Sequence, residues 1–388
     1  MDGLIPDRRW RQQDVDLPAV VAASSRRGSM SSVILSIGPC AGTIDMKVTN
    51  SGLAALTLLV FADLPPALAE TKWNVVKTFQ IGGQGSWDYI TVDSASHRLY
   101  VPRTTHTMVI EAESGRILAD IPGQKNAHGV AIVPESGRGF ISDGGGDGAI
   151  VIFDLKTNAV LGTLAAMPDA DGIIYDPHSG QILTVSGRGK ALMSFKPDID
   201  PQNGKIDQPI ALRGEPEFLA ADAAGKVYIN LMDTHQVAVV DFRTRKVIAN
   251  WPVAPGGLPV GMAIDPKNGR LFIGCRGPRK LIVMSTKDGK VISDLPIGES
   301  VDAVKFDGDY AFASTSGAEL SIARETSPGK FTIVQTVKTG EGARTMGLDA
   351  STRKIYLPAA EFESGANGRR TPKPGSFMIL VVAPQTAK

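Results

Sequence analysis

Cysteine is almost missing from this sequence, and its scarcity excludes several classes of protein. The 388 residues contain two cysteines, Cys40 and Cys275, and neither lies in a CxxC pair or beside a histidine cluster. Zinc-finger and thioredoxin-like interpretations therefore have no support. Cys40 lies in the leader that we expect to be removed on export, as argued below. The mature chain then keeps one cysteine and has no internal disulfide, so packing must stabilise it.

An excess of charge of either sign is also missing. Lysine and arginine number 41 and aspartate and glutamate 40, which leaves a net charge of +1. A protein that binds nucleic acid through its phosphates needs a basic surplus, so a nucleic-acid partner is not expected. Apolar residues make up 43% of the chain, with 42 glycines and 25 prolines. That composition is typical of a turn-rich globular protein rather than a disordered one.

Long hydrophobic runs are missing as well. The strongest run, GLAALTLLVFA at 52–62, is too short to cross a bilayer, which takes about 20 apolar residues. It follows Met46-Lys47 and ends near Ala67 and Ala69, which is the pattern of a secretory signal peptide. We therefore predict a signal peptide at 46–69, cleaved near Ala69, and a periplasmic or secreted product at 70–388. Residues 1–45 have no sustained periodicity, and we interpret them as a disordered upstream extension, with translation starting at Met46.

Helical periodicity is absent from the mature part, where a repeat takes its place. No stretch keeps an apolar period of 3.6 residues over three turns, so few helices are expected. Seven short segments that end in Asp, or an equivalent, recur at intervals of 40 to 46 residues. A regular repeat of this length is typical of blades or solenoid units. The segments are WDYITVD (87–93), AHGVAIV (127–133), ADGIIYD (170–176), PEFLAAD (216–222), PVGMAID (259–265), VDAVKFD (301–307) and ARTMGLD (343–349).

Each repeat contains four short runs rich in Val and Ile and bounded by Gly, Pro, Asn or Asp, which is the signature of strands. The pattern predicts an all-β, seven-bladed β-propeller with four antiparallel strands per blade. A β-sandwich is the alternative, but it does not predict seven equal units. The run at 73–83 resembles a fourth strand without its own blade, and the chain ends on a third strand at 376–384. The N-terminal strand is therefore expected to complete the last blade and to close the ring. A chain that closes its own ring is expected to be a monomer.

The strand pairs LYVP, VYIN, LFIG and IYLP and the DPxxGR-type turns resemble those of the YVTN-repeat (YncE-like) family of exported seven-bladed propellers. The resemblance covers about residues 73–384. It implies the fold and export, but the family looks like a mixed group of lactonase-like hydrolases, ligand binders and uncharacterised members. The fold alone does not decide between these activities.

One position of the repeat collects ionisable residues. Five residues before each end point, at the expected mouth of the central channel, lie Asp88, His128, Asp171, Glu217, Val260, Asp302 and Arg344. Four carboxylates that face one cavity repel each other and titrate as a coupled set, unless a cation, the arginine or the histidine offsets their charge. Such clusters are typical of functional sites. The alternative is a solvated channel mouth without a function.

Loops between second and third strands add a rim to this mouth. Its basic residues are predicted to contact the ligand together with Asp88 and Asp302, because the planar guanidinium group suits carboxylates. The alternative for each is an ordinary exposed loop residue. The predicted rim residues are Arg103, His106, Arg188, His235 and Arg276.

Two functions fit these residues. The first is a non-catalytic binding or scaffold protein that holds a small polar or anionic ligand, or a protein segment, at the channel mouth. The alternative is a lactonase-like hydrolase or a related sugar-acid enzyme. In that enzyme His128 is the general base, Glu217 or Asp171 orients it or acts as the acid, and Arg344 stabilises the oxyanion. Whether the chain is an enzyme stays open.

A divalent cation is a further option. His128 and its ring neighbours Asp88 and Asp171 are the candidate ligands, because only adjacent ring positions reach one ion. A cation held in this way activates water.

Overall fold

The computed structural model describes residues 71–364 and 370–385, and over these residues the chain consists almost entirely of β-strands. The predictions for 1–45 and for the signal peptide at 46–69 concern residues outside this part. Within it, the single helical turn is the 3-10 segment η1 (Pro134–Ser136), so the expectation of few helices is confirmed. None of the described helical structure is long and apolar enough to span a membrane.

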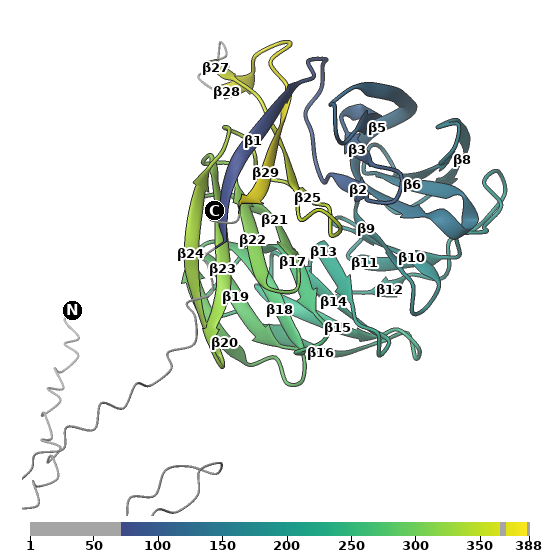
Figure 1. Cartoon of the computed structure of the whole chain (residues 1–388). Helices are drawn as coiled ribbons and strands as arrows, with labels where there is room; N and C mark the ends of the chain where they lie inside the picture. Colours follow the sequence, from purple (N-terminus) through teal and green to yellow (C-terminus); the bar gives the residue numbers. More distant parts are fainter. Residues whose placement is uncertain (1–70, 365–369, 386–388) are drawn as a thin grey trace, which may run out of the picture. The chain divides into compact units, whose positions relative to one another are not determined.

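Four-stranded antiparallel sheets follow one another along the chain, as the repeat predicts (Figure 1). The sheet of the third repeat contains β9 (Ala170–Asp176), β10 (Gln181–Ser186), β11 (Ala191–Phe195) and β12 (Ile210–Ala211). The next contains β13 (Pro216–Ala221), β14 (Lys226–Leu231), β15 (Gln236–Asp241) and β16 (Lys246–Pro252). Then come β17 (Pro259–Asp265), β18 (Arg270–Arg276), β19 (Arg279–Ser285) and β20 (Val291–Pro296). The last of this series contains β21 (Val301–Phe306), β22 (Tyr310–Thr315), β23 (Glu319–Ser327) and β24 (Lys330–Lys338).

The first two repeats share one seven-stranded sheet. Its strand β5 (Ile117–Val133) is 17 residues long, and it pairs with β4 through its first half and with β6 through its second half. One strand therefore serves as the outermost strand of one unit and the innermost strand of the next. The other members are β2 (Thr91–Asp93), β3 (Arg98–Pro102), β4 (Thr104–Glu111), β6 (Arg138–Asp143), β7 (Ala149–Asp154) and β8 (Val160–Ala165).

The two ends of the described chain meet in one sheet. The N-terminal strand β1 (Lys72–Gln80) pairs antiparallel with β29 (Met378–Gln385), from Lys72 opposite Gln385 to Gln80 opposite Met378. Figure 1 shows the two strands side by side. The sheet continues with β26 (Ile355–Ala359) and β25 (Gly347–Leu348), and a separate hairpin is formed by β27 (Phe362–Ser364) and β28 (Arg370–Pro372).

The aspartate that ends the repeat segment folds the following turn. Asp176 accepts hydrogen bonds from the backbone N–H of His178 at 3.1 Å and from the backbone and hydroxyl of Ser179 at 3.1 and 2.6 Å. Gly180 then adopts a φ of 66°, which favours glycine. Asp and Asn stabilise turns in this way. At Val133, where the aspartate is missing, η1 makes the turn instead.

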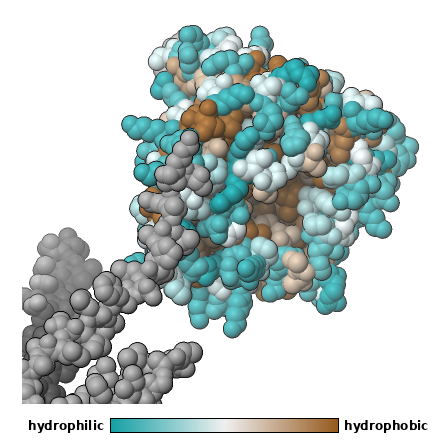
Figure 2. All heavy atoms as spheres, in the orientation of Figure 1, coloured by the Kyte–Doolittle hydropathy of each residue, from teal (hydrophilic) through white to brown (hydrophobic). Residues whose placement is uncertain are grey.

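The core lies between the sheets. The middle strands are buried on both faces, as the run Ile150–Phe153 of β7 illustrates. The outer strands are more exposed, and β16 contains no fully buried residue. Figure 2 shows apolar residues gathered in a hollow on the face in view, with hydrophilic side chains around it.

Candidate functional site

The predicted ring residues come from the beginnings of the innermost strands, and the contacts between these strands hold neighbouring members together. The links between adjacent repeats are hydrogen bonds from Tyr89 N to His128 O at 3.0 Å and from Ala303 N to Arg344 O at 3.1 Å. Between the last repeat and the first, the Thr345 hydroxyl donates to Asp88 O at 2.9 Å. The repeat position that sequence analysis singled out thus places ring residues beside their neighbours.

His128 lies between two carboxylates. Its Nδ1 is 2.7 Å from Asp88 Oδ2 and 3.6 Å from Asp171 Oδ1. On the other side of the ring, Nε2 is 2.7 Å from Asn126 Nδ2. Gly144 packs so close that a Cβ at this position would lie 2.8 Å from Nε2. The imidazole is therefore fixed from three sides, and Asp88, rather than Glu217 or Asp171, is the residue that orients it.

These carboxylates control the charge of His128. Burial by itself would lower the pKa of the imidazole, but the hydrogen bond to Asp88 and the charge of Asp171 outweigh it and raise the pKa to about 9. At neutral pH the ring is then protonated and donates from both nitrogens, so the Asn126 amide must turn its oxygen toward it. A protonated imidazole is no general base. The role of base that the sequence suggested for His128 is therefore disfavoured at neutral pH.

A second cluster forms around Asp302. Its carboxylate, on a residue only 4% exposed, lies 2.6 Å from Arg276 Nη2 and 2.6 Å from Arg344 Nε. Arg276 also donates from Nε to Val301 O at 3.0 Å. Burial and the charge of Asp88 raise the pKa of Asp302 to about 6, although the two arginines oppose that shift. Two arginines held on one carboxylate keep positive charge at this side of the mouth.

The pKa of Glu217 depends on charges in both clusters. Its side chain makes no hydrogen bond with any described residue. Burial, and then the charge of Asp302, raise its pKa to about 7, while Arg276 opposes the shift. Glu217 therefore changes charge close to neutral pH, where neither an ordinary glutamate nor His128 does.

Two buried polar atoms at the mouth lack hydrogen-bond partners among the described residues: Asp171 Oδ1 and Arg344 Nε. The arginine atom lies near Asp302, but its N–H is not aligned for a hydrogen bond. Burial and nearby Glu217 and Asp88 raise the pKa of Asp171 well above its usual value, against the effect of His128. An unsatisfied buried polar group costs about 1–3 kcal/mol. Such atoms indicate a place where a ligand or water supplies the missing partner.

Of the predicted rim residues, Arg276 joins this site and the others have different surroundings in the described chain. Arg103 is 1% exposed and stacks on Phe377 at 3.7 Å. It donates to the carbonyls of Gly82, Gly85 and Ser86, so it supports a loop rather than facing a ligand. His106 lies 3.8 Å from Asp120, His235 accepts from Leu258 N at 2.8 Å, and Arg188 contacts Gly144 O and Gly146 O at 3.5 and 3.4 Å.

The candidate metal ligands are close together. One ligand atom each from Asp88, His128 and Asp171 lies within 4.8 Å of the others. Zinc bonds of about 2.0–2.2 Å place tetrahedral ligand atoms roughly 3.4 Å apart. The distance of 3.6 Å from His128 Nδ1 to Asp171 Oδ1 fits this spacing. The distance of 2.7 Å from His128 Nδ1 to Asp88 Oδ2 is too short and would have to increase when a metal binds. Binding would also have to displace the imidazole proton.

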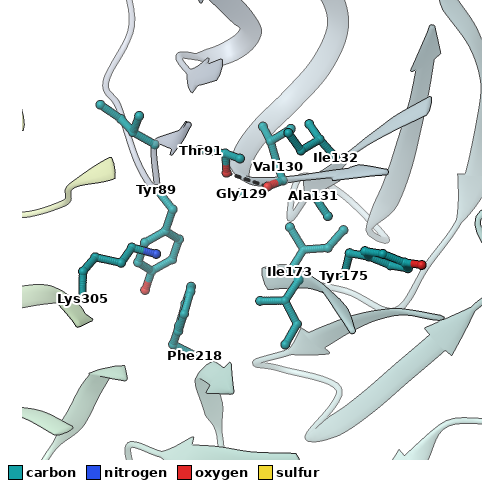
Figure 3. A pocket seen from close by; sticks show the side chains of 12 residues that line it. Tyr89, Thr91, Gly129, Val130, Ala131, Ile132, Ile173, Tyr175, Phe218 and Lys305 are labelled. Carbon is teal, nitrogen blue, oxygen red and sulfur yellow. Dashed lines mark hydrogen bonds between the residues drawn. The ribbon is translucent and has the colours of Figure 1, made fainter. Parts of the chain in front are cut away.

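The residues that follow the ring position on the innermost strands were not selected from the sequence. There a cavity of about 290 Å³ is lined by Tyr89, Phe218, Ile173 and Lys305, among others (Figure 3). Burial, and then the carboxylates of Asp302 and Glu217, raise the pKa of Tyr89 well above its usual value. The sequence contains one indication of this cavity. Lys305 is the sole cation at its place in the seven aligned repeat segments.

Comparisons with known proteins support the fold. No protein-family model matches the chain, and no curated protein sequence matches it. Among solved structures, the WD40 repeats of RRP9 are 12% identical, with a TM-score of 0.67, covering 81% of this chain and 100% of that one. The WD40 propeller domain of Doa1 is 13% identical, with a TM-score of 0.62, covering 81% and 98%. A chain of hydrazine synthase from Kuenenia stuttgartiensis is 12% identical, with a TM-score of 0.62, covering 76% and 96%. The chain therefore has an all-β fold similar to WD40 β-propellers.

Proposed function

We propose that this protein is a binding protein of the propeller class, and that its channel mouth holds a small polar or anionic ligand. The observation that carries the proposal is the buried Asp171 Oδ1, which lies 3.6 Å from His128 Nδ1 but accepts no hydrogen bond from the described residues. A ligand with a hydroxyl or amine group would donate to this oxygen. An acidic group on the same ligand would ion-pair with Arg344 and Arg276, the two arginines that also contact Asp302.

Binding is favoured over hydrolysis because His128 is not available as the general base at neutral pH. The pKa of His128, about 9, keeps the imidazole protonated at neutral pH. A lactonase-like mechanism needs a group that accepts a proton from water in that range. Glu217, with a pKa of about 7, is the better acceptor, but no hydrogen bond with a described residue orients its side chain. Propellers such as the WD40 domains commonly act through binding, and a protein segment is an alternative occupant of the mouth.

Native mass spectrometry on residues 70–388, exported from a bacterial host and not refolded, tests the proposal. The expected result is a small molecule bound at one per chain, which is lost in Asp171→Asn and Arg344→Gln. The control is Asp288→Asn, a change at an exposed position. Asp143→Asn is unsuitable as a control because Asp143 accepts a hydrogen bond from Lys125 N and so stabilises a loop. A bare polypeptide mass in the wild type, or a bound molecule unaffected by both site variants, contradicts the proposal.

A divalent cation is the second candidate, favoured by the three converging ligand atoms of Asp88, His128 and Asp171. Zinc and manganese titrations by calorimetry test it directly. A specific site binds one ion per chain and releases about one proton, because the imidazole must deprotonate. His128→Gln should abolish both the heat and the proton release. Equal binding in this variant excludes the trio as the ligand set.

We further propose that the sheets form seven blades closed by β1, as in the YVTN-repeat family, in an exported monomer. Counting β5 in two units, the seven-stranded sheet supplies two blades and the five four-stranded sheets supply five. The pairing of β1 with β29 and the bond from Trp87 Nε1 to Gly342 O at 3.1 Å support closure. N-terminal sequencing of the exported product, which should begin at Glu70, and its mass by light scattering test export and the monomer.

A further inference from the structure

Lys305 brings an isolated positive charge into the apolar part of the channel. It extends from β21 into the cavity of about 290 Å³ that also includes Tyr89, Val130, Ile173 and Phe218 (Figure 3). Its Nζ lies 5.5 Å from the centre of the Phe218 ring. That ring in turn packs on Tyr89 at 4.8 Å between centres. The ammonium group therefore lies against aromatic side chains, on a residue that is half-buried.

No carboxylate balances this charge. Among the described residues, Lys305 Nζ takes part in no hydrogen bond and no ion pair. Burial alone lowers the pKa of Lys305, whereas the mouth carboxylates all act on Tyr89. Tyr89 directly follows the mouth residue Asp88 in the sequence and lines the same cavity as Lys305. An unpaired charge in an apolar site is costly, so its presence calls for a function or a partner.

The repeat shows that the scaffold does not require this lysine. Lys305 lies two residues before the end point of its segment. At the same place the other six repeats have uncharged residues, namely Thr91, Ala131, Ile174, Ala220, Ala263 and Gly347. The strands around the channel therefore form equally well without a charge at this position.

A second donor faces the same space. The Tyr89 hydroxyl makes no hydrogen bond with any described residue, and its raised pKa keeps it protonated. The hydroxyl of Thr91 is not available in the same way, because it donates to Val130 O at 2.6 Å. An ammonium group and a phenol hydroxyl, with apolar walls around them, match a molecule that has one anionic end and an apolar body.

One end of the cavity lies beside the mouth, at Tyr89, Gly129 and Phe218, and the other end lies farther along the strands. Its lining extends to Tyr175, next to the turn at Asp176, whereas the mouth residue Asp171 is the second residue of the same strand. Four residues of strand span about 13 Å. An anion that reaches Lys305 from the turn side does not pass the acidic mouth.

We propose that this cavity is a separate binding site for a small monocarboxylate with an apolar body, whose carboxylate pairs with Lys305 and accepts a hydrogen bond from Tyr89. The site does not depend on the ligand proposed for the mouth. It differs from that site in chemistry as well, because its walls are apolar.

Calorimetry on residues 70–388 with benzoate and its neutral analogue benzamide tests the proposal. Wild type is expected to bind benzoate at least tenfold more tightly than benzamide. Lys305→Met, which keeps the apolar stem, should lose at least tenfold in benzoate affinity, and Tyr89→Phe should lose less. Lys330→Met, a change at an exposed position of β24, is the matched control and should behave as wild type.

Two further measurements distinguish the role of Lys305 in benzoate binding from an effect on folding and from an effect of the mouth residues. Without ligand, Lys305→Met should melt at a higher temperature than wild type, since an unpaired charge has been removed. His128→Gln should leave benzoate binding unchanged. Undetectable benzoate binding at millimolar concentration, equal affinity for benzamide, or unchanged affinity in folded Lys305→Met would each overturn the proposal.

Discussion

His128 Nδ1 and Asp88 Oδ2 lie 2.7 Å apart, although the two residues belong to different repeats and are separated by 40 positions. The spacing equals one repeat, so the contact joins equivalent places on adjacent innermost strands. One histidine in a ring otherwise made mostly of carboxylates therefore has an acidic neighbour on each side, Asp88 and Asp171. This arrangement keeps the imidazole protonated at neutral pH.

The stability of the protein should depend on pH through His128. Its pKa is raised in the folded chain from 6.5 to about 9, so its contribution is fully present below about pH 6.5 and is lost as the pH rises through 9. This difference between the two pKa values corresponds to roughly 3 kcal/mol in the free energy of unfolding. Asp88→Asn should lower the pKa of His128 and flatten this dependence. Titration of the His128 imidazole by NMR measures the midpoint, and an unchanged midpoint in Asp88→Asn would contradict the prediction.

Glu217 should titrate near neutral pH. Its pKa of about 7 results from burial and from the charge of Asp302, with Arg276 opposing. We expect Asp302→Asn to lower the midpoint and Arg276→Gln to raise it, because the first removes a like charge and the second an opposite one. Carboxyl-carbon NMR on selectively labelled glutamate measures these shifts. If both variants move the midpoint in one direction, the interaction is not electrostatic.

Arg103 should be a structural residue. Its guanidinium group donates to three loop carbonyls and stacks on Phe377. Arg103→Met should lower the free energy of unfolding by about 2–4 kcal/mol, as expected when a buried hydrogen-bonded network is broken. Arg188→Met, whose contacts are long, should cost under about 0.5 kcal/mol. Denaturant unfolding compares the two. If both variants lower the free energy of unfolding by equally small amounts, Arg103 is not structural and is again a candidate ligand contact.

The sequence predicts the fold well because its signals are local and repeated. Strand runs, turn aspartates such as Asp176 and the spacing of the segments each follow from the chain itself. The ring position also follows, since it is defined by its place in the repeat. What the sequence does not contain is side-chain direction. Arg103 and Arg276 occupy similar loops, yet one points into the protein and the other toward Asp302.

Two further residues, Asp88 at the mouth and Lys305 in the separate cavity, also differ from what the sequence predicts. Asp88 orients His128 because its carboxylate lies closer to the imidazole than that of Asp171, a difference that spacing along the chain does not determine. Lys305 was overlooked because the ring position, three residues earlier, drew attention to the mouth. A comparison of every repeat position, and not only the one rich in charges, would have found it.

The N-terminal strand should contribute to stability through one side chain in particular. Trp73 on β1 is 0% exposed and packs edge-on against Phe312 at 4.8 Å and Tyr310 at 6.1 Å, in the neighbouring sheet. The side chain of Gln335 in that sheet accepts from Trp73 N at 2.8 Å and donates to Trp73 O at 2.6 Å. Trp73→Ala should therefore lower the free energy of unfolding by about 3–5 kcal/mol.

Val76 supplies the matched control for Trp73, because it lies on the same strand but is 46% exposed. Val76→Ala keeps the pairing of β1 with β29 and removes little buried surface, so it should cost under about 0.5 kcal/mol. Chemical denaturation of the mature chain measures both variants. If β1 holds the first and last repeats together, the loss in Trp73→Ala appears in one cooperative transition. An early, separate transition that involves only the β1 sheet would mean that this strand is an appendage, and the closed ring would have to be abandoned.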